Sequence, residues 1–333
     1  MEIFTDVRQA NLAGPTYLTI GNLDGMHRGH LSLIEHLVLL LQSEQNQSSN
    51  AQIGLITFDP HPRTILRPEL PLKILSTPEE RMAEAAKAGA TLGVIQPFTS
   101  EIAHLRAVEF MALLKNHLGL KHLVVGPDFA LGKGRSGNVD RLAEIGRELG
   151  YELTVLSQLE WNGRPVRSSQ IRQLLADGDA VSARDLLSRP YAVTGRVIQG
   201  DRRGRTIGIP TANLAVENER LLPMDGVYAT RASILTPPEG RQSHFPPTHL
   251  FDSVTNLGFR PTVEGREHRF ETHLLDFSHP NDPDSLYGAI LRVEFIDRLR
   301  GEKRFNGLDE LVRQINTDIE KARTILRQPA ISK

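Results

Sequence analysis

The chain has 333 residues, a length that corresponds to about two ordinary domains. Its 39 Lys and Arg residues balance 40 Asp and Glu residues, so net charge gives no reason to expect a nucleic-acid or membrane partner. Cysteine is absent, which excludes disulfides, thiolate catalysis and cysteine-bound metal centres. We find neither a signal peptide nor an apolar run long enough to cross a bilayer, and we expect a cytoplasmic protein.

The first half of the chain alternates short apolar runs with amphipathic segments. The predicted strands are residues 17–20, 53–58, 92–96, 122–126 and 151–156. The predicted helices between them are residues 31–41, 78–88, 107–117 and 139–149. Most of these strands are mainly apolar without alternation, as expected where both faces of a sheet are covered. This order predicts an α/β fold with a doubly wound, parallel sheet.

The pattern changes near residue 188. Extended segments then follow one another without helices between them, at residues 191–198, 226–233, 250–256, 269–277 and 287–295. A helix returns only at residues 308–327. Several strands followed by one helix predict an all-β domain, an antiparallel β-barrel with a terminal helix. We therefore predict two domains, residues 1–187 and residues 188–330.

A glycine-rich turn joins the first predicted strand to the first predicted helix, and it reads GNLDGMHRGH over residues 21–30. Glycines let a backbone approach a ligand closely, and a helix start offers free N–H groups to an anion. Doubly wound sheets bind ligands at such a junction, which favours a phosphate site over a tight turn with surface histidines. The candidate residues are Gly21, Asn22, Asp24, His27, Gly29 and His30.

A second glycine-punctuated segment reads GDRRGRTIGIPTAN over residues 200–213. Backbone N–H groups and arginines in such a loop can bind phosphates, although the segment is not a Walker A motif. The alternative is a charged hairpin tip, which composition alone favours. The candidate residues here are Gly200, Arg205, Gly208, Thr211 and Asn213.

The turn at residues 21–30 resembles that of the HxGH nucleotidylyltransferases, and more closely that of bacterial bifunctional riboflavin kinase/FAD synthetases. Three further segments resemble this family in order: TFDPHP at 57–62, VGPDFALGKGRSG at 125–137 and VRSSQIR at 166–172. The resemblance implies a Rossmann-like domain that transfers an adenylyl group from ATP to FMN. It implies phosphate binding by His27 and His30, triphosphate binding by Ser168, Ser169 and Arg172, and flavin binding by Asp128 and Phe129.

The second half resembles the riboflavin kinases of the same family. The PTAN motif at residues 210–213 implies that Thr211 and Asn213 place Mg²⁺ and the ATP phosphates. The segment ETHLLDF at 271–277 resembles a strand whose Glu is the catalytic base, so the resemblance selects Glu271 for that role. The segment NLGFRPT at 256–262 resembles a loop near the substrates, which makes Arg260 a flavin-binding candidate.

We therefore expect an enzyme that phosphorylates riboflavin to FMN and then adenylylates FMN to FAD. Its expected partners are riboflavin, FMN, ATP and Mg²⁺, with the flavins as substrates and products, and the expected state is a monomer or weak homo-oligomer. Two alternatives stay open. One is a riboflavin kinase with an impaired adenylyltransferase, because Pro127 and Ala130 replace residues that are usually polar in the family. The other is a non-catalytic flavin-binding protein.

Overall fold

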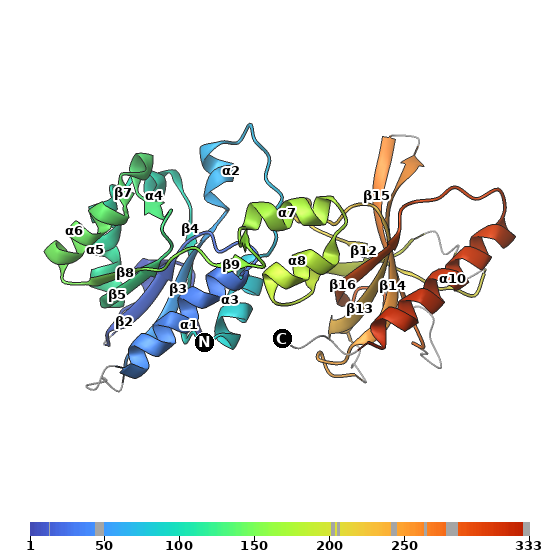
Figure 1. Ribbon diagram of the computed structural model, residues 1–333, viewed down its shortest axis with the longest axis horizontal. Coiled ribbons are helices and arrows are strands. Elements are labelled where there is room, and N and C mark those ends of the chain that lie inside the picture. Colours follow the sequence, from blue (N-terminus) through green and yellow to red (C-terminus); the bar gives the residue numbers. More distant parts are fainter. Residues whose placement is uncertain are drawn as a thin grey trace. The chain divides into compact units, whose positions relative to one another are not determined.

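A computed structural model describes residues 1–12, 14–43, 50–200, 204, 207–240, 245–262, 265–277 and 286–328. Contacts between its residues divide the chain into two compact units, Met1–Ser168 and Ser169–Lys333. Figure 1 shows a sheet covered by helices in the first unit and a barrel with one long helix in the second. The predicted functional boundary at residues 187 and 188 stays a prediction.

The first unit is built on a six-stranded parallel sheet. Its strands are β1 (Glu2–Phe4), β2 (Thr16–Ile20), β3 (Gln52–Asp59), β4 (Leu92–Pro97), β5 (Leu120–Val125) and β8 (Glu152–Val155). Their spatial order is β1-β4-β3-β2-β5-β8, so the chain moves outward from β2 to β4 and returns to the other side of β2. The carboxyl ends of β2 and β5 are therefore the point where ligands bind in doubly wound sheets.

Helices cover both faces of this sheet (Figure 1). The longer ones are α1 (Arg28–Ser43), α3 (Pro78–Lys87), α5 (Ala107–Leu118) and α6 (Val139–Leu149). The shorter elements are η1 (Val7–Gln9), α2 (Pro62–Leu66), α4 (Ser100–His104), β6 (Ala130–Leu131), η2 (Lys133–Arg135), β7 (Gly137–Asn138), β9 (Glu160–Trp161) and β10 (Arg164–Pro165). Helices α5 and α6 end at Gly119 and Gly150, whose left-handed backbone favours glycine.

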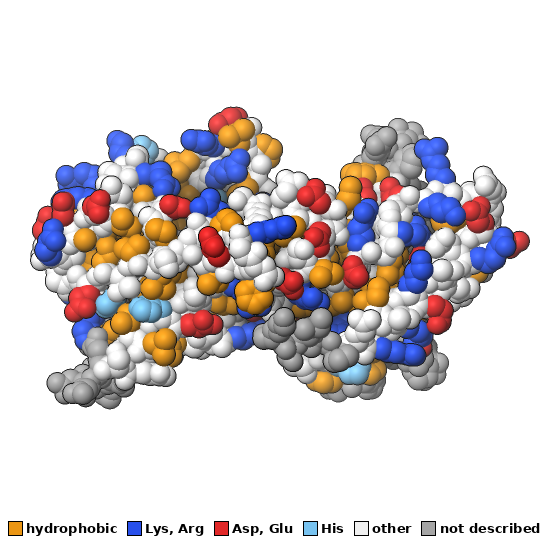
Figure 2. Space-filling model, viewed as in Figure 1, with side chains coloured by type: hydrophobic (Ala, Val, Ile, Leu, Met, Phe, Trp, Pro, Cys, Tyr) orange, Lys and Arg blue, Asp and Glu red, His pale blue; other side chains and the backbone are white. Residues whose placement is uncertain are grey.

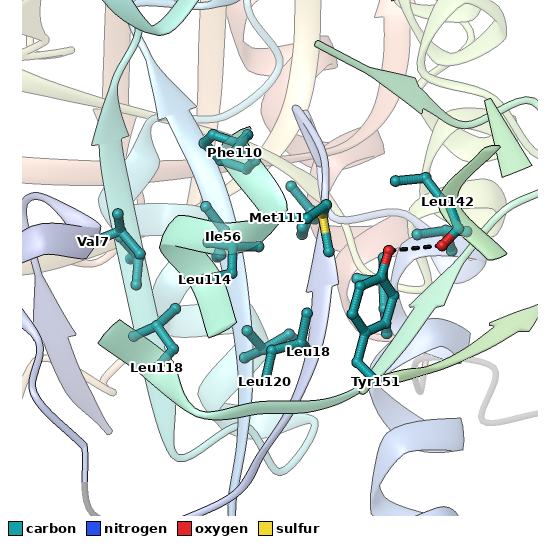
Figure 3. Packing of buried hydrophobic residues seen from close by; sticks show 14 of the residues in the cluster. Val7, Leu18, Ile56, Phe110, Met111, Leu114, Leu118, Leu120, Leu142 and Tyr151 are labelled. Carbon is teal, nitrogen blue, oxygen red and sulfur yellow. Dashed lines mark hydrogen bonds between the residues drawn. The ribbon is translucent and has the colours of Figure 1, made fainter. Parts of the chain in front are cut away.

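The two faces of the sheet have separate hydrophobic cores. Leu18 and Ile56 face α5 and α6, and Figure 3 shows them beside the apolar side chains of α5. Their sequence neighbours Tyr17 and Leu55 point to the opposite face and pack with α1 and α3. Each fully buried side chain of this kind contributes about 1.5–3 kcal/mol relative to exposure. Burial on both faces explains why the strands are apolar without alternation.

The second unit contains a closed barrel of antiparallel strands in the order β11-β12-β15-β14-β13-β16. The strands are β11 (Tyr191–Ile198), β12 (Ala212–Ala215), β13 (Gly226–Thr236), β14 (Phe251–Thr262), β15 (Gly265–Leu274) and β16 (Ile290–Arg300). Helices α7 (Ser168–Ala176) and α8 (Ala180–Leu187) precede the barrel, and α10 (Leu308–Leu326) follows it. Both halves of the predicted fold class are confirmed.

Helix α10 lies against the outside of the barrel. Its Ala322 and Leu326 pack with Val227, Ala229 and Val254 of β13 and β14. Two ion pairs hold it there. Arg323 donates to both carboxylate oxygens of Asp276 at 2.7 and 2.8 Å. Arg300 donates through Nε to the buried Asp318 at 2.9 Å. These contacts fix the distance between the helix and the strands beneath it.

Charged side chains of both signs are interspersed over the face of the molecule in Figure 2. This distribution agrees with the near-zero net charge of the sequence. Within the residues that the structure describes, no helix is long and apolar enough to span a bilayer.

Candidate functional site

The glycine-rich turn lies directly after β2, at the point where the strand order of the sheet reverses. His27 and His30 lie together in it, with stacked rings whose centroids are 3.5 Å apart. A Cβ on Gly29 would come within 3.3 Å of His27 Nδ1, so the glycine between the histidines leaves room for this stack. The turn is thus built to hold two imidazoles at the start of α1, where backbone N–H groups favour an anion.

The other predicted residues of the turn are held by the surrounding structure. The backbone N–H of Gly21 donates to the Ile56 carbonyl at 3.1 Å. The Asp24 carboxylate is 2% exposed and accepts hydrogen bonds from neighbouring backbone N–H groups. The Ser168 hydroxyl donates to the Asp24 carbonyl at 2.9 Å. The structure therefore brings Ser168 to the turn, whereas Ser169 and Arg172 lie on α7 in the second unit.

The loop predicted to bind flavin follows β5. Phe129 packs against the core formed by α5 and α6 and is partly buried. The Asp128 side chain is 83% exposed, and its carboxylate lies 3.5 Å from the Arg167 guanidinium. Both residues precede the small hairpin of β6 and β7. The loop is thus anchored by its aromatic side chain and leaves its carboxylate open to solvent.

A cavity of about 820 Å³ lies in the second unit, which is the usual size of a small-molecule site. Glu271, Thr211, Asn213 and Gly200 all line it. A Cβ on Gly200 would lie 2.2 Å from the Asn213 Nδ2 atom, so only glycine permits this close approach. Four residues predicted from two separate segments of the sequence therefore share one cavity.

Strand register explains how three of the lining side chains come together. Glu271 of β15 pairs with Asn213 of β12 on one side and with Asn256 of β14 on the other. Directly paired residues lie on the same face of a sheet, so the carboxylate sits between two amides. Arg269, two residues before Glu271 on the same strand, donates to Glu271 Oε1 at 3.3 Å. The sequence interpretation missed Asn256 and Arg269 as site residues.

Helix α10 supplies another wall of the cavity, which is mainly apolar although Asp318 also lines it. Leu311, Ile315 and Ile319 line it from there. A cavity with one polar wall and one apolar wall suits a ligand that combines a flat ring with phosphates or hydroxyls.

Of the remaining predicted residues, Gly208 has a left-handed backbone (φ +76°) and open space around its Cα. Arg205 and the side chain of Arg260 lie outside the described residues.

The donors in this cavity fit Mg²⁺ that arrives with a nucleotide. Thr211 and Asn213 supply hard hydroxyl and amide oxygens, which this ion prefers. Among the described residues, no group of three or more His, Asp or Glu side chains has the geometry of a metal site. The protein thus offers part of a coordination shell, and phosphates and water would complete it.

His273 on the cavity wall should make the stability of the second unit depend on pH. Burial lowers its pKa from the ordinary value of 6.5, against a smaller opposing effect of the hydrogen bond from Nδ1 to the Pro210 carbonyl. The unfolded chain therefore binds this proton more readily, and the free energy of unfolding should fall as pH drops below about 6.5. Urea unfolding at several pH values measures this fall, which should be smaller in His273→Gln. Equal falls in both proteins would contradict the assignment.

Comparisons with known proteins match both units. A family model described as riboflavin kinase matches residues 187–326, and one described as FAD synthetase matches residues 9–170. The bifunctional riboflavin kinase/FMN adenylyltransferase of Escherichia coli K12 is 35% identical over 316 residues, which are 94% of each chain. The Bacillus subtilis protein of the same name is 31% identical and covers 92% of this chain and 90% of its own.

A solved structure shares the whole fold. It is a crystal structure described as a macrolide-efflux protein from Streptococcus pneumoniae, and it superposes with a TM-score of 0.81 at 27% sequence identity. The superposition covers 97% of this chain and 98% of the other. Both family models and the full-length relatives lead to the same conclusion: the chain belongs to the bifunctional riboflavin kinase/FMN adenylyltransferase family.

Proposed function

We propose that the protein makes FMN and FAD in two steps at two separate sites. As a member of its family it phosphorylates riboflavin with ATP to give FMN, and it adenylylates FMN with ATP to give FAD and pyrophosphate. We assign the adenylyltransferase to residues 1–187 and the kinase to residues 188–330, and the extents of the two family models support this division.

In the kinase step, Glu271 accepts the proton of the riboflavin 5′-hydroxyl as that oxygen attacks the γ-phosphorus of ATP. The bond from the γ-phosphorus to the bridging oxygen breaks, and ADP leaves. Asn213 and Asn256 flank the carboxylate and restrict its orientation. Thr211 and Asn213 would hold Mg²⁺ with the phosphates, and the ion would supply neutralisation of their charge. Backbone N–H groups of the loop with Gly200 and Gly208, together with Arg205, bind the nucleotide.

In the adenylyl step, a phosphate oxygen of FMN attacks the α-phosphorus of ATP, and pyrophosphate leaves. The nucleophile is already an anion, so the protein needs no strong base, and positioning with charge neutralisation supplies the rate. His27 and His30 bind phosphate oxygens beside the backbone of the turn. That backbone includes Gly21, Asn22 and Gly29, and Asp24 maintains its shape. We also assign triphosphate binding to Ser168, Ser169 and Arg172, as the resemblance to the family implies.

The flavin contacts follow from the same division. Asp128 and Phe129 serve the flavin of FMN in the first unit, and Arg260 serves riboflavin in the second. The partly buried aromatic ring of Phe129 anchors its loop, which supports this assignment. We further propose that the protein acts as a monomer or weak homo-oligomer.

The observation that carries this proposal is the row of Asn213, Glu271 and Asn256 in one cavity. A chromatographic time course of the purified protein with riboflavin, ATP and Mg²⁺ tests it. FMN followed by FAD is the expected result. FMN alone would favour a kinase with an impaired adenylyltransferase, and bound flavin without any product would favour a non-catalytic flavin-binding protein.

Both reactions should depend on a divalent cation. We expect EDTA to stop the formation of FMN and of FAD, because the triphosphate charges are then not neutralised, and added Mg²⁺ to restore both. The thermal midpoint should not change with EDTA, since the described residues contain no cluster that would hold a metal by itself. Activity that persists in excess EDTA would contradict the Mg²⁺ assignment.

A further inference from the structure

An arginine is buried in the first unit beside the phosphate-binding turn. Arg81 of α3 is 1% exposed, although its helix otherwise buries apolar side chains such as Met82 and Ala85. Burial lowers its pKa, while the carboxylates of Asp24 and Asp59 oppose that effect. The guanidinium remains charged in any case, so the core contains a cation that a methionine of similar length would have avoided.

Two chains of hydrogen bonds connect Arg81 to the turn, and the first passes through the hydroxyl of Thr57. Arg81 Nη1 donates to Thr57 Oγ1 at 2.7 Å. Thr57 Oγ1 in turn donates to the backbone carbonyl of Asn22 at 2.9 Å. Thr57 is itself fully buried at the end of β3, so water does not replace either contact. The guanidinium thus fixes the direction in which the Thr57 hydroxyl donates.

The second chain of hydrogen bonds reaches the turn through Ser76, in the segment before α3. Arg81 Nη2 donates to the Ser76 carbonyl at 3.1 Å. The Ser76 hydroxyl accepts from the Gly25 backbone N–H at 2.7 Å, and the Ser76 backbone N–H donates to Asp24 Oδ1 at 3.0 Å. Arg81 is therefore linked through single residues to Asn22, Asp24 and Gly25.

The backbone of the turn needs such support. Leu23 and Met26 have positive φ angles of 49° and 40°, a region that costs non-glycine residues about 1 kcal/mol or more. Leu23 follows the residue whose carbonyl accepts from Thr57, which is Asn22, and Met26 follows Gly25, whose N–H donates to Ser76. Such strain persists where the surrounding structure over-determines it, and it is commonly found where a backbone is shaped for a ligand.

We propose that Arg81 and Thr57 are positioning residues of the adenylyltransferase, which hold the turn so that His27 and His30 meet the ATP phosphates. This inference rests on the proposed function of the turn. Neither side chain touches the nucleotide in this scheme. Their effect passes through the Asn22 carbonyl and the backbone that carries the histidines.

The sharpest test removes the hydroxyl link and keeps the side-chain volume. In Thr57→Val, the kcat for FMN adenylylation should fall about 10- to 100-fold, as for a misplaced catalytic group, with a smaller change in the KM for ATP. Thr57→Ser keeps the hydroxyl and should retain most of the activity. Riboflavin kinase activity, measured on the same preparations, should not change in either variant.

Thr19→Val is the matched control. Thr19 is also fully buried, on the neighbouring strand β2, and its hydroxyl has no hydrogen-bond partner among the described residues. Its adenylyltransferase kcat should equal that of the wild type. Circular dichroism and thermal melting show whether each variant is folded. If the Thr57 hydroxyl only stabilises the fold, Thr57→Val should lower the thermal midpoint and leave kcat per folded molecule unchanged.

Two results would overturn the inference: a Thr57→Val kcat within about twofold of the wild type, or an equal loss in Thr19→Val. Arg81→Lys gives an independent check, because lysine keeps the charge but cannot donate to Thr57 and Ser76 as a fork. It should lose adenylyltransferase kcat and keep kinase activity. If the wild-type protein forms no FAD at all, the proposed function fails instead, and the two failures are thereby distinguished.

Discussion

The substitution Glu271→Gln should abolish the formation of FMN from riboflavin while FAD still forms from added FMN. The amide has the size of the carboxylate and can still interact with Asn213 and Asn256, but it cannot accept the proton of the 5′-hydroxyl. Loss of a general base lowers the rate by about 10²- to 10⁴-fold. Separate initial-rate assays with riboflavin and with FMN measure the two activities, and the fall should lie in kcat rather than in the KM for ATP.

The chain offers a close control for this variant. Glu294 of β16 accepts from Arg292 at 3.3 Å, two residues away on its strand, as Glu271 accepts from Arg269. Glu294 does not line the cavity, so Glu294→Gln should keep both activities. Kinase activity above about a tenth of the wild-type rate in Glu271→Gln would show that the carboxylate is not the base. An equal loss in Glu294→Gln would show that the effect comes from breaking an arginine–glutamate pair.

Five of the six strands in the sheet of the first unit were predictable because their signals are local, and β1 (Glu2–Phe4) was not predicted. Strands β2 to β5 each contain a short, mainly apolar run, and α5 and α6 end at the glycines that stop them in the sequence pattern. Strand β12 was not predicted. It has four residues, Ala212–Ala215, and exists because β11 and β15 pair with it on either side. No local pattern encodes those distant pairings.

The site residues differ in the same way, because local motifs identify some of them and only contacts between distant segments identify the others. The histidine pair and Glu271 came from sequence motifs, and the structure places each beside other predicted residues. Asn256 reaches Glu271 only through the register of β14 and β15, which the sequence does not state. Arg81 was missed for a related reason. Its helix is amphipathic, and a charged residue in such a pattern normally faces solvent, so only tertiary contacts reveal its burial.

The substitution His30→Ala should have the opposite effect to Glu271→Gln. It removes one of the two stacked imidazoles, whose centroids are 3.5 Å apart, and with it a donor to the phosphate oxygens of ATP. Loss of one donor that stabilises transition-state charge costs about 10²- to 10³-fold in kcat. FAD formation from FMN should therefore fall by that factor, while riboflavin is still converted to FMN. In the proposed scheme the kinase does not use this turn, so FMN should accumulate in a time course with riboflavin and ATP.

His36→Ala provides the control on the same helix, because His36 lies on α1 two turns further from the phosphate-binding turn. It should leave both activities unchanged. Loss of both activities in folded His30→Ala protein would refute separate sites. Full FAD formation in that variant would instead remove the HxGH turn from the chemistry, although the family assignment would stand. Together, His30→Ala and Glu271→Gln test whether one chain carries out two independent reactions, because each substitution should stop one reaction and leave the other intact.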